Sequence, residues 1–314
     1  GIPYEQLFKE NSNILNKYFP DLEIIIKEGY RIYKLKEKKL DFDDLVSIYL
    51  NAQRNSEDWA FLAKKEIKRI IVDEFQDTDL EQLEWLKLLS PEKLTVVGDD
   101  WQAIYSFRGA TIEPFLNFPK YFPDTEILYL TTNYRSLHDI IEVSKTPILK
   151  NANNIQKITK SYRKEKAGIF KFYLNKEKDW NDFLVIFERE NLIKYNPYIL
   201  SRTNYRLQQL KKLGFPEDRL ITIHKSKGLE FETVILDLFD GWSKNDSGDD
   251  IDYEEERRIL YVGLSRAMNN LILIGNKSKS KKCPEGEFFY YFKKSIKEFP
   301  PGDFYKNLNK LNSI

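Results

Sequence analysis

Two neighbouring carboxylates follow a short apolar run near residue 70, and this pairing suits metal-dependent hydrolysis. Residues 70–72 are Ile-Ile-Val, and Asp73 and Glu74 come directly after them. Such a run predicts a short strand buried on both faces, and ligands of open α/β sheets bind at the carboxyl ends of the strands. An aspartate there can hold Mg²⁺, and the next glutamate can polarise an attacking water. Taken alone, the dipeptide is equally compatible with an acidic turn.

Two further clusters of polar residues follow predicted strands. Residues 94–97 (Leu-Thr-Val-Val) predict a strand that ends at the polar stretch 98–109, and residues 127–130 (Ile-Leu-Tyr-Leu) predict a strand that leads to 133–136. Ligand-type residues at the same end of successive strands arise by chance much less often than one such cluster. The repetition therefore favours a ligand site over an isolated turn.

The elements around these clusters alternate between strand and helix patterns, which predicts a parallel α/β fold. Apolar residues recur at helical spacing over residues 4–50, with a break at Pro20-Asp21, and Asp41 and Asp79 are suited to cap helices. Later strands are predicted at 168–174, 197–201, 219–223, 233–238 and 270–274. Helices are predicted at about 136–150, 178–190, 204–213 and 253–267, with an aromatic helix at 288–292.

Length and composition describe a soluble globular protein. The chain has 314 residues, enough for two domains, with 41% hydrophobic and 32% charged residues. No apolar run approaches the ~20 residues that span a membrane, and the first residues lack the basic-then-apolar order of a signal peptide. The single cysteine, Cys283, excludes an internal disulfide and a cysteine-based zinc site. These features predict a cytoplasmic protein without a membrane partner.

The net charge of +1 gives no overall signature of nucleic-acid binding. Lysines gather locally in 145–178 and 277–282, and residues 246–256 are acidic. A lysine-rich stretch is usually a solvated face, so it is weak evidence for a DNA partner.

Five stretches resemble motifs II to VI of the UvrD/Rep/PcrA helicases of superfamily 1. In family order, the stretches are 73–77, 98–110, 132–136, 221–231 and 254–267. Residues 41–45 also match the segment that precedes motif II. The matches keep the family order over about residues 30–275, so the set is highly specific. The resemblance implies an α/β fold with two RecA-like lobes and parallel sheets. Residues 1–125 would form the C-terminal part of the first lobe with a remnant of its helical insert, and 126–314 the second lobe with a basic tail.

The resemblance also implies an ATP site with Mg²⁺. By this match, Asp73 holds the metal, Glu74 orients the water, and Gln102 senses the γ-phosphate. Arg135 and Arg266 match the two arginine fingers, and the planar guanidinium suits this role because it binds phosphate oxygens bidentately.

Other motif positions imply contacts with the nucleoside and with DNA. For the nucleoside, Tyr134 matches the aromatic residue that stacks on adenine, Glu230 matches the carboxylate near the ribose, and Gly228 lies in the same motif. The matched positions for single-stranded DNA are Tyr105, Phe107, Arg108, Thr222 and His224. At Phe107 the family uses a larger tryptophan, and Trp101 and Ala103 replace its usual acidic residue and serine.

Two parts of the family pattern are missing from the 314 residues. No Gly-Lys-Ser/Thr occurs, so motif I, whose amides and lysine bind the β- and γ-phosphates, is absent. The large accessory insert is also absent, because Asn204 reaches Ile221 through a short connection. We therefore expect an incomplete first lobe, with the P-loop supplied by an N-terminal segment or by a partner subunit.

The leading interpretation is an ATP-dependent DNA helicase or single-stranded DNA translocase core of 3′ to 5′ polarity. Its substrate would be single-stranded DNA or DNA with a single-stranded tail, and it would not be active as this chain alone. The alternative is a DNA-binding or partner-docking module that never hydrolyses ATP, although complete motifs II to VI weigh against it. A nuclease partner is a third possibility, with its activity lying outside this chain.

Overall fold

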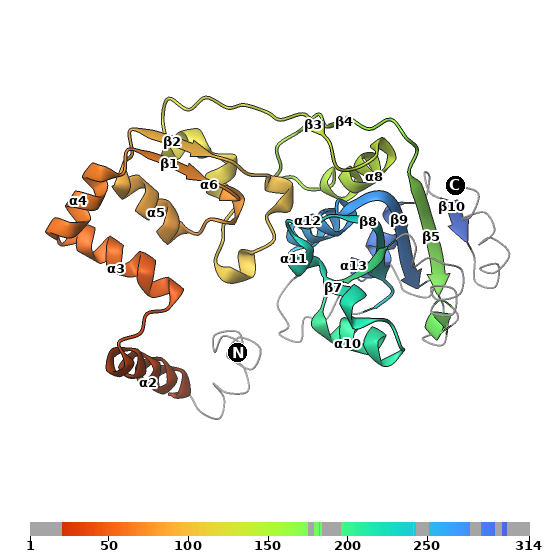
Figure 1. Ribbon diagram of the computed structural model, residues 1–314, viewed down its shortest axis with the longest axis horizontal. Helices are drawn as coiled ribbons and strands as arrows, with labels where there is room; N and C mark the ends of the chain where they lie inside the picture. The colour runs from red at the N-terminus through yellow and green to blue at the C-terminus, as the bar shows by residue number, and fades with distance from the viewer. Residues whose placement is uncertain are drawn as a thin grey trace. The chain divides into compact units, whose positions relative to one another are not determined.

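The computed structural model describes residues 21–174, 179–181, 183, 196–240, 242, 251–276, 284–292 and 297–299. The predicted helix before residue 21 and most of the predicted helix 178–190 lie outside these residues. The chain divides into two compact units (Figure 1). Unit 1 comprises Gly1–Gly98, Gly109–Thr111 and Asn245–Ile251, and unit 2 comprises Asp99–Arg108, Ile112–Lys244 and Asp252–Ile314. No helix in the described part of the chain has the length and hydropathy of a membrane span.

Unit 1 contains four described helices, and the predicted caps are confirmed. The helices are α2 (Leu22–Glu37), α3 (Phe42–Arg54), α4 (Asp58–Glu66) and α5 (Leu80–Leu89). The Asp41 carboxylate accepts a hydrogen bond from the Asp44 backbone N–H, and the Asp44 carboxylate accepts one from the Asp41 N–H. Asp79 and Gln82 form the same reciprocal pair at α5. Each capping box satisfies N–H groups that a helix start leaves unpaired.

The sheet of unit 1 is small in the described residues. Strand β1 (Arg69–Val72) pairs in parallel with β2 (Lys93–Val96), with Ile70 opposite Leu94. A small core of Tyr49, Ala52, Ala60 and Leu89 packs against Ile70. The prediction that the 70–72 run is buried on both faces is wrong here, because the Ile71 side chain is 77% exposed. The reason is that successive strand residues point to opposite faces, and the core covers only the Ile70 face.

Unit 2 is built on a six-stranded parallel sheet, which confirms the predicted fold class. The strand order is β10-β5-β9-β8-β6-β7. The strands are β5 (Gly168–Leu174), β6 (Pro197–Ser201), β7 (Leu220–Thr222), β8 (Phe231–Leu238), β9 (Ala267–Asn276) and β10 (Lys297–Phe299). A separate parallel pair joins β3 (Thr132–Asn133) to β4 (Lys160–Ser161). The five later strand predictions are therefore confirmed.

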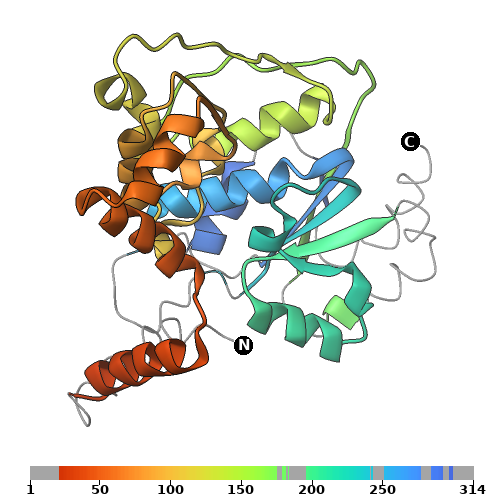
Figure 2. The ribbon, with the colours of Figure 1, turned by 60° about the vertical axis from the view of Figure 1, so that its left-hand side comes forward.

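Helices cover both faces of this sheet (Figure 2). The longer helices are α8 (His138–Ile148), α10 (Asn204–Lys212), α12 (Tyr253–Leu264) and α13 (Pro284–Tyr291). Short helices are α6 (Glu113–Leu116), α7 (Phe118–Tyr121) and α11 (Ile223–Ser226), and 3₁₀ turns are η2 (Asp100–Gln102), η3 (Ser106–Arg108) and η5 (Glu217–Arg219). Residues of α8, α12 and α13 share one core cluster with the sheet, and α10 joins the other. Along β9, Leu271 and Leu273 belong to the first cluster and Ile272 and Ile274 to the second. This alternation is the period of a strand that is buried on both faces.

One predicted strand is absent. Residues 127–130 have no regular structure, and Leu128 and Leu130 are 79% and 94% exposed. In the described part of the chain, no strand lies beside this segment to complete a hydrogen-bonded ladder. The apolar run predicted the strand from composition, but a strand also needs a neighbour for its backbone groups.

The interior of unit 2 holds a buried ion pair. The Arg206 Nε donates to Asp237 Oδ2 at 2.6 Å, and the two side chains are 2% and 0% exposed. The guanidinium also lies over the Trp180 ring, 4.9 Å from its centroid. The Ser201 hydroxyl donates to the same Asp237 oxygen at 3.1 Å. Removing one partner of such a pair leaves a buried charge without compensation.

We expect Arg206→Met to lower the free energy of unfolding by about 3–5 kcal/mol, because the Asp237 carboxylate would stay buried without its cation. Urea unfolding followed by circular dichroism measures this loss. The control is Lys211→Met, which breaks an ion pair with Glu217 whose side chains are 54% and 73% exposed. That control should cost less than about 1 kcal/mol. Equal losses in the two variants would contradict the role of the buried pair.

Candidate functional site

The two carboxylates of unit 1 stand at the end of β1, as predicted. Asp73 Oδ1 accepts a hydrogen bond from the Glu74 backbone N–H at 2.9 Å. Glu74 has φ 52°, in the left-handed region, and its Oε2 accepts from Gln76 Nε2 at 2.5 Å. A non-glycine residue in this region costs free energy and is often found at functional sites. Sequence reasoning missed Gln76, which is buried and holds the Glu74 carboxylate.

The carboxylates that follow β1 are suited to bind Mg²⁺. In the described part of the chain, no group of three or more His, Cys, Asp or Glu side chains could hold a metal ion. Mg²⁺ does not need such a cage, since it keeps several waters and takes one or two carboxylates together with substrate phosphates. An exposed Asp73 is therefore a suitable single protein ligand.

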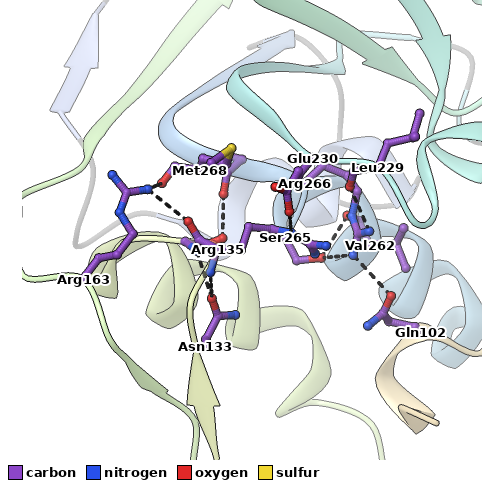
Figure 3. Close-up of polar contacts among 12 residues, drawn as sticks. Gln102, Asn133, Arg135, Arg163, Leu229, Glu230, Val262, Ser265, Arg266 and Met268 are labelled. Carbon is purple, nitrogen blue, oxygen red and sulfur yellow. Dashed lines mark hydrogen bonds and ion pairs between the residues drawn. The ribbon is translucent and has the colours of Figure 1, made fainter. Parts of the chain in front are cut away.

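In unit 2, the predicted residues Gln102 and Arg266 are brought together (Figure 3). Arg266 Nη2 donates to Gln102 Oε1 at 3.2 Å and to Ser265 Oγ at 3.0 Å. Arg266 Nε donates to the Val262 carbonyl at 3.0 Å, and Nη1 donates to the Leu229 carbonyl at 3.2 Å. Arg266 is only 1% exposed, and these four bonds go to neutral oxygen atoms. The guanidinium is thus held in a fixed orientation at the C-terminal end of α12.

The η2 turn that carries Gln102 is fastened from several sides. Gln102 Nε2 donates to Asp99 Oδ2 at 2.8 Å, and Lys227 Nζ donates to the Gln102 carbonyl at 3.0 Å. Lys157 Nζ forms ion pairs with both Asp99 and Asp100. The single positive charge of Lys157 therefore offsets one of the two negative charges on these adjacent carboxylates, and the Asp100 side chain is 0% exposed.

Trp101, which replaces the family's usual acidic residue, is buried and packed against neighbouring residues. Its ring is 2% exposed and meets the Tyr261 ring edge-on at a centroid distance of 5.4 Å. Its Nε1 donates to the Ile155 carbonyl at 3.1 Å, and Lys157 Nζ lies 5.0 Å from the ring centroid. Trp101 thus packs the η2 turn against α12 and the segment around residue 155.

The second predicted arginine, Arg135, pairs with the predicted carboxylate Glu230. Arg135 Nε donates to Glu230 Oε2 at 2.7 Å, and the side chains are 30% and 50% exposed (Figure 3). Asn133 Oδ1 accepts from the backbone N–H groups of Arg135 and Ser136, both at 2.9 Å. Arg163 Nη1 donates to the Arg135 carbonyl at 3.0 Å. Sequence reasoning named Asn133 only as part of a motif and did not identify Arg163.

Three other predicted residues occupy different environments. Tyr134 is 68% exposed and lies beside Tyr162. Gly228 has φ +80°, a conformation that favours glycine. Thr222 is 5% exposed, and its hydroxyl accepts from the Lys225 N–H at 3.2 Å as the N-cap of α11. The Thr222 side chain thus has a structural partner in its own helix.

The predicted DNA-contact residues Tyr105, Phe107, Arg108 and His224 form one cluster. The ring centroids are 5.9 Å apart for Tyr105 and Phe107, 6.1 Å for Tyr105 and His224, and 5.6 Å for Phe107 and His224. The Arg108 guanidinium lies 5.0 Å from the Tyr105 centroid and 5.4 Å from the Phe107 centroid. Phe107 is 51% exposed, so its ring is open to a ligand. Cations among accessible aromatic rings are suited to stack on bases and neutralise phosphates.

Three glutamates in the first turn of α12 form hydrogen bonds with three neighbouring segments. Sequence reasoning did not predict this arrangement. Glu254 Oε1 accepts from the Ala152 N–H at 2.7 Å. Glu255 Oε1 accepts from the Ser106 N–H at 3.0 Å, which fixes the segment between Tyr105 and Phe107. Glu256 accepts two hydrogen bonds from the Arg202 guanidinium, at 2.7 and 3.0 Å. The only sequence signal was the run of three glutamates.

Burial lowers the pKa of His224 to about 4, and the positive charges of Arg202, Arg108 and Lys227 act in the same direction. A hydrogen bond with the Ile104 backbone opposes this shift. The ring is therefore neutral near pH 7. Because the folded state disfavours the charged ring relative to the usual value of 6.5, this group lowers stability progressively as the pH falls from 6.5 to about 4.

We expect the His224 imidazole C2–H resonance to titrate with a midpoint near pH 4, measured by NMR. The chain has two histidines, so a His224→Asn variant identifies the resonance by its loss. The variant should also lose less stability than the wild type between pH 6.5 and the onset of acid unfolding. A midpoint near 6.5 would contradict the partly buried environment with its neighbouring cations.

Comparison with known proteins supplies two family matches. Residues 4–123 match the UvrD/REP helicase N-terminal domain, and residues 199–278 match the UvrD-like helicase C-terminal domain. The region between Asp73 and Arg108 falls in the first match, and Thr222 through Arg266 fall in the second.

Curated relatives carry helicase names. A probable DNA helicase of Mycoplasma pneumoniae is 30% identical over 285 residues, covering 84% of this chain and 54% of the relative. The ATP-dependent DNA helicase Rep of Buchnera aphidicola subsp. Acyrthosiphon pisum is 31% identical over 223 residues, covering 68% of this chain and 34% of the relative. The chain thus spans about half the length of the first relative and about a third of the second.

Among solved structures, the PRRSV helicase aligns with 68% of this chain and 36% of its own, at 15% identity and a TM-score of 0.40. That score is too low to bear on the fold. The sequence matches are a stronger basis, since both domains of one helicase family occur in order along the chain and named relatives extend across both. The chain belongs to the UvrD/REP helicase family.

Proposed function

We propose that this chain is the core of an ATP-dependent DNA helicase or single-stranded DNA translocase, with 3′ to 5′ polarity. The observation that carries the proposal lies in segment 99–108 of unit 2. At one end of this segment Gln102 bonds to Arg266, a suitable phosphate ligand, and at the other Tyr105 and Phe107 form an aromatic cluster. One ten-residue segment therefore bonds to a candidate phosphate-binding arginine and also carries two candidate base-stacking rings.

In the proposed nucleotide site, ATP is the substrate and the protein residues position it. Tyr134 stacks on the adenine, and Glu230 lies near the ribose. Arg135 and Arg266 stabilise charge that develops on the transferred phosphoryl group. Hydrogen bonds to neighbouring residues already hold both arginine side chains in position. Little entropy is therefore lost in orienting them when the substrate binds. Gly228 allows the backbone turn before Glu230.

The role of Arg266 requires a local rearrangement. Its guanidinium is 1% exposed and its bond to Gln102 occupies one donor direction. A phosphate oxygen that reaches Arg266 would displace or share Gln102. We propose that this exchange is how the glutamine registers the γ-phosphate.

In unit 1, Asp73 would hold Mg²⁺ and Glu74 would orient and deprotonate the attacking water. Mg²⁺ supplies charge neutralisation on the phosphates when it is bound. The Gln76 amide holds the Glu74 carboxylate through its Oε2 atom. The general base is thereby kept in one orientation at the end of β1.

A phosphate cradle must complete the site, and the 314 residues contain no Gly-Lys-Ser/Thr to provide it. We propose that a further segment or a partner subunit supplies this P-loop. The exposure of apolar side chains supports this proposal. Ile71 in unit 1 and, separately, Leu128 and Leu130 in unit 2 are 77%, 79% and 94% exposed, surfaces that soluble proteins usually cover. Isolated from that segment, the chain would not turn over ATP.

We expect Glu74→Gln to lower the kcat of DNA-stimulated ATP hydrolysis by about 10²–10⁴-fold, because the amide cannot accept the proton of the water. The assay uses the chain joined to, or mixed with, a polypeptide that supplies the P-loop. The control is Glu81→Gln, an exposed glutamate on α5, which should leave kcat unchanged.

Undiminished turnover in Glu74→Gln would overturn the role of that residue. A reconstituted wild-type protein that binds single-stranded DNA but never hydrolyses ATP would instead support a non-hydrolysing DNA-binding or partner-docking module. Hydrolysis without strand separation would favour a translocase that serves a nuclease or another partner over a helicase.

We expect Phe107→Ala to weaken binding of the chain to single-stranded DNA by about tenfold, since stacking contributes roughly 1–3 kcal/mol per base. Fluorescence anisotropy with a labelled oligothymidine at fixed ionic strength measures this change. Phe107→Trp is the matched variant, and its larger face should tighten binding relative to the wild type. Equal affinities for all three proteins would show that the ring does not touch the DNA.

A further inference from the structure

The two rings of the candidate DNA cluster that lie in segment 99–108 are carried by a very short turn. Tyr105 precedes the 3₁₀ turn η3, and Phe107 lies within it. The Arg108 backbone N–H donates to the Tyr105 carbonyl at 2.9 Å. A 3₁₀ turn of this length has few hydrogen bonds of its own, and their geometry is poor. The orientation of the rings therefore depends on how the turn is attached to the rest of unit 2.

Ser106, the residue between the two rings, is attached to unit 2 by the Glu255 carboxylate. The Ser106 backbone N–H donates to Glu255 Oε1 at 3.0 Å, and the Ser106 hydroxyl donates to Oε2. Hydrogen bonds to a carboxylate are roughly twice as strong as those between neutral groups. Because the two bonds use different oxygens of one planar group, they fix the orientation of Ser106 as well as its position.

The Glu255 carboxylate is itself carried by a firmly packed helix. The Asp252 carboxylate caps α12 by accepting hydrogen bonds from the N–H groups of Glu254 and Glu255, at 2.9 and 3.1 Å. One turn further along, Ile259 and Leu260 are 1% and 0% exposed and belong to the core of unit 2. A side chain on such an element is placed more precisely than one on a loop. Glu255 thus connects the turn with the rings to the framework of unit 2.

A carboxylate at this position is electrostatically unfavourable for DNA binding. The Arg108 guanidinium and the Lys227 ammonium each lie 5.0 Å from the Tyr105 ring centroid, and such cations attract phosphates. Glu255 places a negative charge beside the same segment. If charge alone mattered, removing Glu255 would strengthen DNA binding. A weakening on removal can therefore come only from the geometry that Glu255 maintains.

We propose that Glu255 is a positioning residue for single-stranded DNA, which holds Ser106 so that the rings of Tyr105 and Phe107 are arranged for stacking before the DNA arrives. The inference rests on the proposed function, in which these rings stack on bases. Rings that are already ordered lose little conformational entropy on binding. Without Glu255 the turn must be ordered during binding, which lowers the affinity.

The test measures binding of the 314-residue chain to a labelled oligothymidine by fluorescence anisotropy at fixed ionic strength. Glu255→Ala should weaken binding by about threefold to tenfold, the cost of ordering the loosened side chains. Glu255→Gln keeps an oxygen that can accept from the Ser106 N–H, and it should retain most of the affinity. The control is Glu254→Ala, which removes the same charge from the same turn but loses the bond to Ala152 instead. This control should not weaken binding.

A second background shows whether Glu255 acts through the rings. In Phe107→Ala, the added change Glu255→Ala should cause a much smaller loss than in the wild type, because one of the rings that it positions is already missing. Urea unfolding of each variant, followed by circular dichroism, checks that the fold is intact. Ser106→Ala removes only the hydroxyl bond and should have an intermediate affinity. If Glu255→Ala does not fold, Ser106→Ala serves for the same comparison in both backgrounds.

Three results would overturn the positioning role. Unchanged or tighter binding by Glu255→Ala, while Phe107→Ala weakens it, would remove the role and leave the proposed function in place. Equal losses in the wild-type and Phe107→Ala backgrounds would show that Glu255 acts elsewhere. If Phe107→Ala has no effect, or the wild type does not bind oligothymidine, the DNA assignment of the cluster fails together with this inference. The hydrolysis assay of Glu74→Gln then judges the proposed ATPase separately.

Discussion

The arrangement of unit 2 around its candidate site depends on the burial of one cation. Arg266 lies at the end of α12 with 1% exposure, and an isolated buried charge is costly unless its donors are satisfied. Carbonyls of Val262 and Leu229 and the side chain of Gln102 accept from it. Those three acceptors come from α12, from the segment before β8 and from the η2 turn. Satisfying a single guanidinium therefore fixes three segments that are distant in sequence.

Helix α12 extends this constraint along its length. Arg266 follows its C-terminal end, and its first turn carries the three consecutive glutamates Glu254, Glu255 and Glu256, which form hydrogen bonds with other segments. Negative charge in the first turn also interacts favourably with the helix dipole. Glu255 accepts a hydrogen bond from the Ser106 N–H, and Gln102 accepts one from Arg266 near the other end of the helix. Segment 99–108 is therefore held at two points.

The parts of the fold that could be predicted from sequence were those with strong local signals. The runs at 168–174 and 197–201 match β5 and β6 because strands buried on both faces are rich in apolar and aromatic residues, although β5 also contains the buried Lys171. Asp41 and Asp79 cap their helices because carboxylates compete well for unpaired N–H groups. The motif residues were found through the resemblance to a helicase family, and Gln102 and Arg266 meet in space although 164 positions separate them.

The features that could not be predicted from sequence depend on which residues become neighbours in the folded chain. The run 127–130 resembles β5 in composition, yet no strand bonds to it in the described part of the chain, and Ile71 is exposed because a core covers one face of β1 only.

Lys157 is one lysine in a basic stretch, and nothing local distinguishes it from its neighbours on a solvated face. Only the fold reveals that it forms ion pairs with both Asp99 and the buried Asp100, next to a tryptophan that replaces the usual acidic residue. With an acidic side chain at 101, three adjacent carboxylates would share one lysine. The aromatic ring removes one negative charge from this cluster and adds a cation–π contact, so the departure from the family pattern is consistent with a stable η2 turn.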